Sequence, residues 1–143
     1  MKKIVVLVIV IFLLSCGEQF IVNGNLRDKQ RKKDIVAAIV AVLSENGYSA
    51  SMANENLGIV NSAWKANYLK RRKLNFTFDE QKYLIKMIPH YQIRTGTNEE
   101  NQNAIWRNYR MSDELKKEFE KILNQIAKRL DTSVTIKWVR VGS

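Results

Sequence analysis

The chain has 143 residues, with 24 lysines and arginines against 14 aspartates and glutamates and a formal net charge of +10 at pH 7. This length predicts one domain with a substantial core, and the charge favours anionic partners. A single cysteine and a single histidine leave no material for an internal disulfide or for a zinc site built from several thiolates and imidazoles.

The first predicted element is an apolar run near the N-terminus. Two lysines precede eleven apolar residues, 4–14, and the run ends in Leu13-Leu14-Ser15-Cys16. A basic start and an apolar core of about 7 to 15 residues are typical of a secretory signal peptide. The stretch resembles the signal peptide and lipobox of bacterial lipoproteins. This resemblance implies cleavage before Cys16, a diacylglycerol on its sulfur and acylation of the new amino group.

An uncleaved membrane anchor is the alternative. A helix that crosses a bilayer needs about 20 apolar residues, whereas a polar sequence interrupts this run at Cys16. A longer span would bring Glu18 into lipid at a cost of several kcal/mol. We therefore predict a signal peptide over residues 1–15 and a lipid anchor in the cell envelope. The protein would lie on the outer membrane facing the periplasm in a Gram-negative cell, and otherwise on the outer face of the cytoplasmic membrane.

Residues 16–31 are expected to form the lipidated cysteine and a flexible tether, because they are polar and show no clear periodicity. Near an anionic membrane, cations such as Arg27, Lys29 and Arg31 would each add about 1 kcal/mol of attraction. A solvated linker explains them as well. Residues 32–143 are predicted to form a single globular domain.

The domain is predicted to begin with a helix over about Lys32–Asn46, whose apolar residues recur at the spacing of one buried face. Gly47 would end this helix in a left-handed conformation. Alternating residues predict a strand over 48–53 and, after a turn at 54–58, another over about Ile59–Tyr68.

Four consecutive cations follow: Lys70, Arg71, Arg72 and Lys73. We expect them at a hairpin tip between two strands. A solvated tip is one interpretation. The other is a binding site for an anionic head group or an acidic partner, formed together with the nearby rings of Trp64 and Tyr68.

Two further strands are predicted by alternation, the first over about 74–78 and the second, after a turn at 79–82, over Tyr83–Arg94. Pro89 lies inside the second strand. Because proline lacks an N–H for the ladder, we expect an edge strand or a bulge there.

Residues 95–111 are expected to be a polar loop that carries Trp106 and Tyr109. Aromatic residues are enriched at the centres of protein interfaces, so these two, with Trp64, are candidate interface residues. A loop folded back over the sheet would bury the rings equally well, and we favour that interpretation.

The last elements are a helix and a strand. Ser112 is the expected N-cap of a helix that runs to about Leu130 and has the clearest apolar stripe in the domain. Alternating residues then predict a strand over Val134–Trp138.

This order predicts an α+β domain with an antiparallel sheet of about four to five strands and both helices packed on one face. The order, with Gly47-Tyr48 opening one strand and Gly58-Ile59-Val60 another, resembles helix-grip domains of envelope lipoproteins. That class includes the C component of the outer-membrane β-barrel assembly machinery. The resemblance covers about residues 32–130 and implies a helix-grip-like arrangement.

No catalytic constellation stands out in the sequence. His90 is interpreted as a surface residue, and Glu99 and Glu100 are adjacent acids in a loop, with nothing to set them across a substrate as in a glycosidase. There is no glycine-rich phosphate loop. We expect no catalytic residues, no metal and no cofactor.

The leading functional hypothesis is a lipid-anchored, non-enzymatic envelope protein that binds another envelope component as an assembly or scaffolding accessory. The alternative is a lipid- or lipopolysaccharide-handling protein with an acyl chain in a groove between helices and sheet. A wall enzyme is the third hypothesis. The expected partners are the membrane, an envelope protein or anionic lipid, and the location disfavours nucleic acid.

Overall fold

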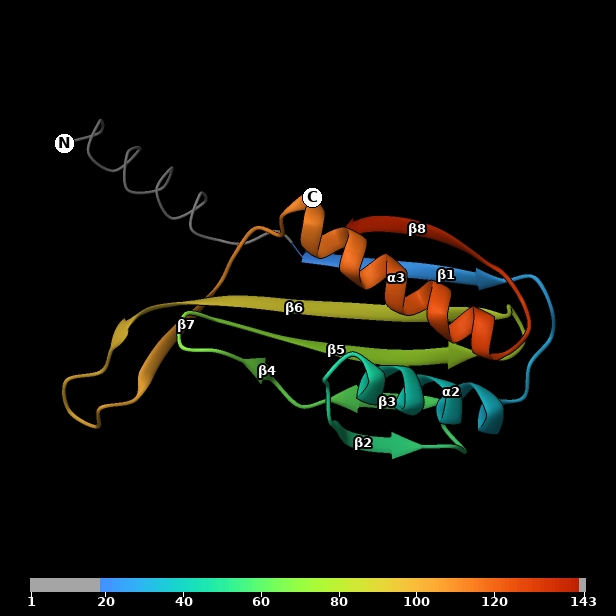
Figure 1. Cartoon of the computed structure of the whole chain (residues 1–143), viewed down its shortest axis with the longest axis horizontal. Helices are drawn as coiled ribbons and strands as arrows, with labels where there is room; N and C mark the ends of the chain where they lie inside the picture. Colours follow the sequence, from blue (N-terminus) through green and yellow to red (C-terminus); the bar gives the residue numbers. More distant parts are fainter. Residues whose placement is uncertain (1–18, 142–143) are drawn as a thin grey trace.

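A computed structural model describes residues 19–141, so the predicted signal peptide and Cys16 lie outside the described residues. Within this range the fold is α+β, with two helices and an eight-stranded antiparallel sheet (Figure 1). The elements are β1 (Gln19–Leu26), α2 (Lys32–Glu45), β2 (Ala50–Asn54), β3 (Ile59–Ser62), β4 (Lys65–Ala66), β5 (Lys70–Asp79), β6 (Leu84–Thr97), β7 (Ala104–Asn108), α3 (Asp113–Arg129) and β8 (Val134–Val141).

Both predicted helices are confirmed, with the expected ends. The Ser112 hydroxyl accepts a hydrogen bond from the Leu115 N–H at 3.2 Å and caps α3. Gly47 follows α2 with a φ of +80°, the left-handed conformation that ends a helix without a steric penalty. Local sequence signals therefore determine where α3 begins and where α2 ends.

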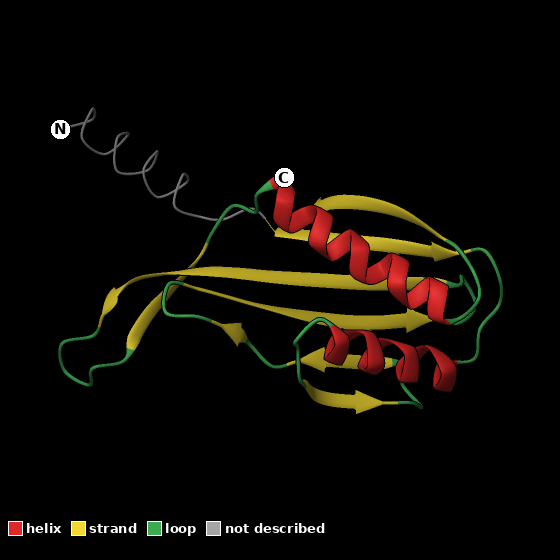
Figure 2. Ribbon diagram, in the orientation of Figure 1, coloured by secondary structure: helices red, strands yellow, loops and turns green. Residues whose placement is uncertain are grey.

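The sheet has the strand order β2-β3-β5-β6-β1-β8, and β4 and β7 add to β5 and β6 respectively. Both helices lie over the same face of this sheet, which we call the covered face (Figure 1). They stop short of one end, where β4, residues 70–73, residues 90–97 and β7 form a four-stranded extension (Figure 2). We call this extension the distal half and the remainder the helix-covered half.

The core lies between the helices and the helix-covered half of the sheet. Phe119 and Ile122 of α3 and Phe76 and Met87 of the sheet are completely buried. Burying a side chain of this size stabilises the fold by about 1.5–3 kcal/mol. The buried residues of the main core cluster fall within 22–127, and Val134, Ile136 and Trp138 of β8 pack against them.

The expected tether differs from the structure, because residues 19–26 form β1 in the interior of the sheet between β6 and β8. Phe20, Val22 and Leu26 alternate toward the core, but glycine occupies the inward position between Val22 and Leu26 and weakens the apolar pattern. A Cβ on Gly24 would lie 3.0 Å from a methyl carbon of Val134. Close packing against Val134 therefore explains why glycine occupies this position, and a sequence pattern does not reveal such packing.

The sheet is also larger than expected, with eight strands within residues 19–141 in place of four to five. The expected loop at 95–111 contains β7, which pairs with the far end of β6. The expected strand over Ile59–Tyr68 is split into β3 and β4. These short strands gain their partners from the long β5–β6 hairpin, and their own sequences are too brief to predict them.

Pro89 lies in β6, which has partner strands on both sides and pairs with β5 there without a shift of register, so neither the predicted edge strand nor the predicted bulge is found at this residue. It lies opposite Leu74 of β5. On the other side of β6, the pairing with β1 extends as far as Met87 and the pairing with β7 begins at Gln92. Pro89 thus lies between two partner strands, where the N–H that it lacks is not needed for the ladder.

Candidate interaction surface

The four consecutive cations do not form a hairpin tip. They are the first residues of β5, and Lys70–Lys73 pair with residues 90–93 of β6. Side chains alternate between the faces of a strand. The sheet therefore separates the run into Lys70 and Arg72 on the covered face and Arg71 and Lys73 on the opposite, uncovered face.

Arg72 has a structural role on the covered face. Its guanidinium donates to the Glu118 carboxylate of α3 at 2.8 Å and to the Tyr48 hydroxyl at 2.9 Å. Burial raises the pKa of Tyr48 to about 12. Burial opposes the charge of Arg72, but Tyr48 and Glu118 outweigh it and raise the pKa of Arg72. This network holds α3 against β5, so Arg72 is not available to a partner.

Arg71 lies on the uncovered face and connects the run of cations with the candidate interface tryptophans. Its guanidinium carbon lies 4.2 Å from the ring centroid of Trp64 and 4.6 Å from that of Trp106. Its Nε donates to the Gln92 side chain at 2.8 Å. A guanidinium within about 6 Å of an indole face is attracted by the ring quadrupole. Arg71 therefore fixes two tryptophans from opposite edges of the distal half.

Lys73 and His90 extend this group along the strand. The ammonium of Lys73 lies 4.7 Å from the Trp64 ring centroid, and the His90 ring meets Trp64 edge-on at 6.5 Å. Burial, and after it the charge of Lys73, lowers the pKa of His90, so the imidazole is neutral at pH 7. We call Trp64, Arg71, Lys73, His90 and Trp106 the aromatic–basic cluster.

A second ring–cation pair lies beyond this cluster in the distal half. The guanidinium of Arg94 lies 4.3 Å from the Tyr68 ring centroid, and Tyr68 is 73% exposed. Tyr68 was noted in the sequence beside the cations, but its partner Arg94 was not. The alternation of β6 places Arg94 on the same face as His90 and could have identified it.

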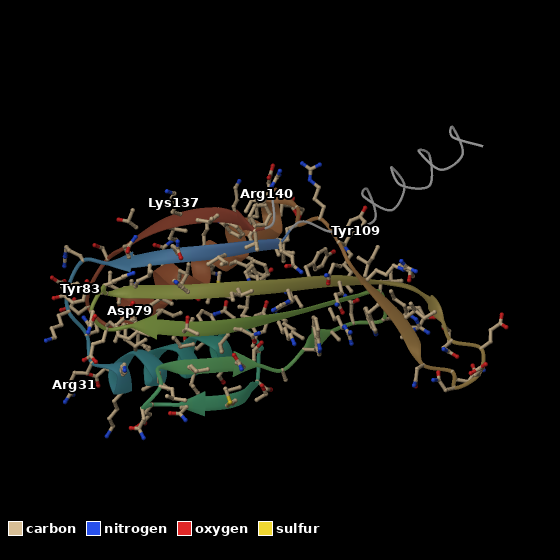
Figure 3. All side chains as sticks on the ribbon, turned by 180° about the vertical axis from the view of Figure 1, so that it is seen from behind. Arg31, Asp79, Tyr83, Tyr109, Lys137 and Arg140 are labelled. Atoms are coloured by element: carbon tan, nitrogen blue, oxygen red, sulfur yellow. The ribbon has the colours of Figure 1, made fainter. Side chains whose placement is uncertain are left out.

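Tyr109 and Trp106 lie on different faces, although the sequence grouped them. Tyr109 meets Tyr91 edge-on at 6.4 Å on the covered side of β6, and it is 52% exposed. Figure 3 shows Tyr109 where the chain leaves β7 for α3. The two rings are not buried together under a folded loop, because they belong to a strand and its end.

The uncovered face continues from the cluster onto the helix-covered half, seen from behind in Figure 3. Lys86 of β6, Asn23 of β1 and Lys137 of β8 lie opposite one another in register and form a row, which we call the lysine row. Both lysines are exposed. Sequence analysis missed this row because strands distant in the sequence supply it.

A comparison with known protein families and with curated proteins found no match. Within residues 19–141, neither helix is long and apolar enough to cross a membrane. In the same range, no three histidine, cysteine, aspartate or glutamate side chains lie together as metal ligands would.

Two hollows of the described surface lie away from the aromatic–basic cluster. One hollow of about 470 Å³ lies at the opposite end of β5 from Arg71, with Asp79 and Lys86 in its lining. Another, of about 490 Å³, is lined by Ala38 of α2 and Leu130 after α3. The space between helices and sheet is filled by buried side chains. The arrangement suits contact with an extended anionic surface.

Proposed function

We propose that this protein is a lipid-anchored, non-enzymatic component of the cell envelope that binds an anionic envelope partner through the uncovered face of its sheet. The observation that supports this most is Arg71, held between Trp64 and Trp106 on a face that also presents Lys73. Aromatic and arginine side chains are the usual energetic centres of interfaces. A protein that binds an envelope partner without catalysing a reaction would act as an assembly or scaffolding accessory.

The packing between helices and sheet favours this function over the alternative of a lipid-carrying groove. An acyl chain in that position would need the volume that Phe119, Phe76 and Met87 occupy, and all three are completely buried. Interiors packed to this degree hold few voids larger than a water molecule. Two helices on one face of an antiparallel sheet also support the helix-grip-like classification, which stays a prediction.

The first test concerns the anchor. Replacing Cys16→Ala removes the sulfur that would carry the lipid, so metabolic labelling with a fatty acid should be lost and a larger precursor should accumulate. Cys16→Ser preserves size and polarity but cannot form the thioether, so it should lose the label as well, which would exclude a change of side-chain size as the cause. Label and mature size in the Ala variant would refute the lipid anchor.

The second test concerns the face. Reversing Arg71→Glu and Lys73→Glu should weaken binding to anionic envelope fractions, and added salt should weaken the contact as well. Lys117→Glu with Lys121→Glu on exposed positions of α3 makes the same change of charge on the other side of the molecule. Equal effects of the two pairs would contradict a specific role for the uncovered face. Loss of binding with Trp106→Ala alone, without salt dependence, would indicate an aromatic protein interface.

A further inference from the structure

The uncovered face differs in charge from the helix layer. The strand register places five cations on this face: Arg71, Lys73, Lys86, Arg94 and Lys137. Among the strand residues described, its one carboxylate is Asp79, which accepts backbone N–H bonds from Gln81 and Lys82. The two helices together carry seven basic and six acidic residues. The strand residues of the uncovered face therefore carry a larger net positive charge than the two helices do.

Apolar side chains lie between these cations. Ile88 of β6 is 38% exposed and Val139 of β8 is 37% exposed, and Ile21 of β1 lies opposite Val139. This apolar row is one step along the strands from the lysine row, and Lys73 and His90 lie on its other side. Apolar groups beside cations and tryptophans match the interfacial zone of a bilayer, where phosphates lie next to acyl carbons.

The proposed anchor would lie close to this face. β1 begins at Gln19, and extending its register with β6 brings Gln19 level with His90. Gln19 is three positions along the chain from Cys16, a span of at most about 10 Å. Lipid attached to Cys16 would therefore hold the junction of the two halves near the membrane surface.

We propose that the uncovered face lies on the anionic head groups of the membrane that holds the anchor, with α2 and α3 directed away from it. This inference rests on the proposed lipid anchor and identifies the anionic partner as lipid. A folded acidic protein would need its own complementary shape, whereas a bilayer matches a broad face with a central apolar row. The distal half then extends along the membrane surface.

The three tryptophans give a direct test in the anchored protein. Trp64 and Trp106 belong to the uncovered face, whereas Trp138 is on the covered side and donates to Glu120 at 2.7 Å. Three single-tryptophan versions of the lipidated protein, with Phe at the other two positions, are reconstituted with brominated phosphatidylglycerol. Trp64 and Trp106 should lose emission relative to unbrominated lipid, and Trp138 should not. Quenching of Trp138 alone, or of none, would overturn the orientation.

A second test uses residues 17–143, which contain the complete core, without an anchor. Because each cation near an anionic surface contributes about 1 kcal/mol, Lys86→Gln with Lys137→Gln should weaken binding to phosphatidylglycerol vesicles about 30-fold. Lys117→Gln with Lys121→Gln on α3 removes the same charge and should change binding much less. Equal weakening by the two pairs would overturn the proposal.

The outcomes also separate this inference from the proposed function. Vesicle binding by the unanchored domain does not depend on Cys16, so it can succeed even if fatty-acid labelling fails. A labelled Cys16 with no vesicle binding would keep the anchor and refute the docked face. Binding to lipopolysaccharide or an acidic protein but not to phosphatidylglycerol would likewise refute the membrane as the occupant of this face.

Discussion

The two halves of the β5–β6 hairpin share strands but differ in how they are held. In the helix-covered half, Phe76 and Met87 are paired across the hairpin and completely buried under the helices. In the distal half, Arg71 is paired with Gln92 and lies between two indole rings at the surface. Hydrophobic burial stabilises the first half, while ring–cation contacts and hydrogen bonds organise the second. The comparison shows that one continuous hairpin can supply both a core and a binding face.

The helix-covered half gives way to the distal half where the residues of the strands change from apolar to charged. The covered face of β5 carries Phe78, Phe76 and Leu74 and then Arg72, whose charge is satisfied by Glu118. Pro89 marks the same level on β6, between the pairing with β1 and the pairing with β7. Beyond this level the sheet has no helix to pack against, so its side chains must be stable in water.

The largest expected effect is a truncation in the helix-covered half. Phe119 is completely buried, so Phe119→Ala should lower the free energy of unfolding by about 3–5 kcal/mol through lost burial and a cavity. Tyr109→Ala in the distal half, where the ring is 52% exposed, should cost less than about 1 kcal/mol. Urea denaturation measures both. Similar costs would abolish the contrast between the halves.

A smaller effect is expected from the stack in the distal half. Arg71→Met removes the cation between Trp64 and Trp106 and should cost about 1–2 kcal/mol, since each exposed cation–π contact contributes about 0.5–1 kcal/mol. Lys70→Met, at an exposed position one residue earlier, should stay within about 0.5 kcal/mol. Thermal denaturation and tryptophan emission would report the loss. Equal values would mean that the stack does not organise the distal half.

The polar network between the halves predicts a loss of stability at alkaline pH. Burial raises the pKa of Tyr48 from 10.0 to about 12. The folded state thus disfavours the phenolate, and the stabilising contribution is present below pH 10 and decreases as pH rises toward 12. Tyr48→Phe should flatten this part of the profile, measured by urea denaturation at successive pH values. An unchanged slope would show that Tyr48 is not the group responsible.

The smallest expected effect on stability comes from the titration of His90, the one histidine of the chain. Burial and the charge of Lys73 hold the pKa of His90 below 6.5, so its contribution to stability is present above pH 6.5 and decreases as pH falls through the folded pKa. An NMR titration of the single imidazole should give a value below 6.5, and Lys73→Gln should raise it. A value at or above 6.5 would mean that the cluster is open to water.

Much of the candidate site was present in the sequence, but in separate pieces. The sequence indicates the cations of residues 70–73, Trp64 and Trp106 separately, yet the contacts that unite Trp64, Arg71 and Trp106 depend on two short strands, β4 and β7, that pair with opposite edges of one hairpin. Lys86 and Lys137 were not predicted, because they become neighbours only through β1. Spacing along a chain does not report such pairings between distant strands.

The sequence by itself determined the elements whose signals are local. The apolar stripe and Ser112 cap specified α3, Gly47 ended α2, and alternation identified the centres of β5, β6 and β8, because each signal acts within a few residues. Only the tertiary structure decided that β1 enters the interior of the sheet, that β7 pairs with the end of β6, and which cations face the tryptophans. Those outcomes depend on close packing at Gly24 and on strand partners far away in the chain, since a backbone segment adopts a strand only where a neighbour satisfies its hydrogen bonds.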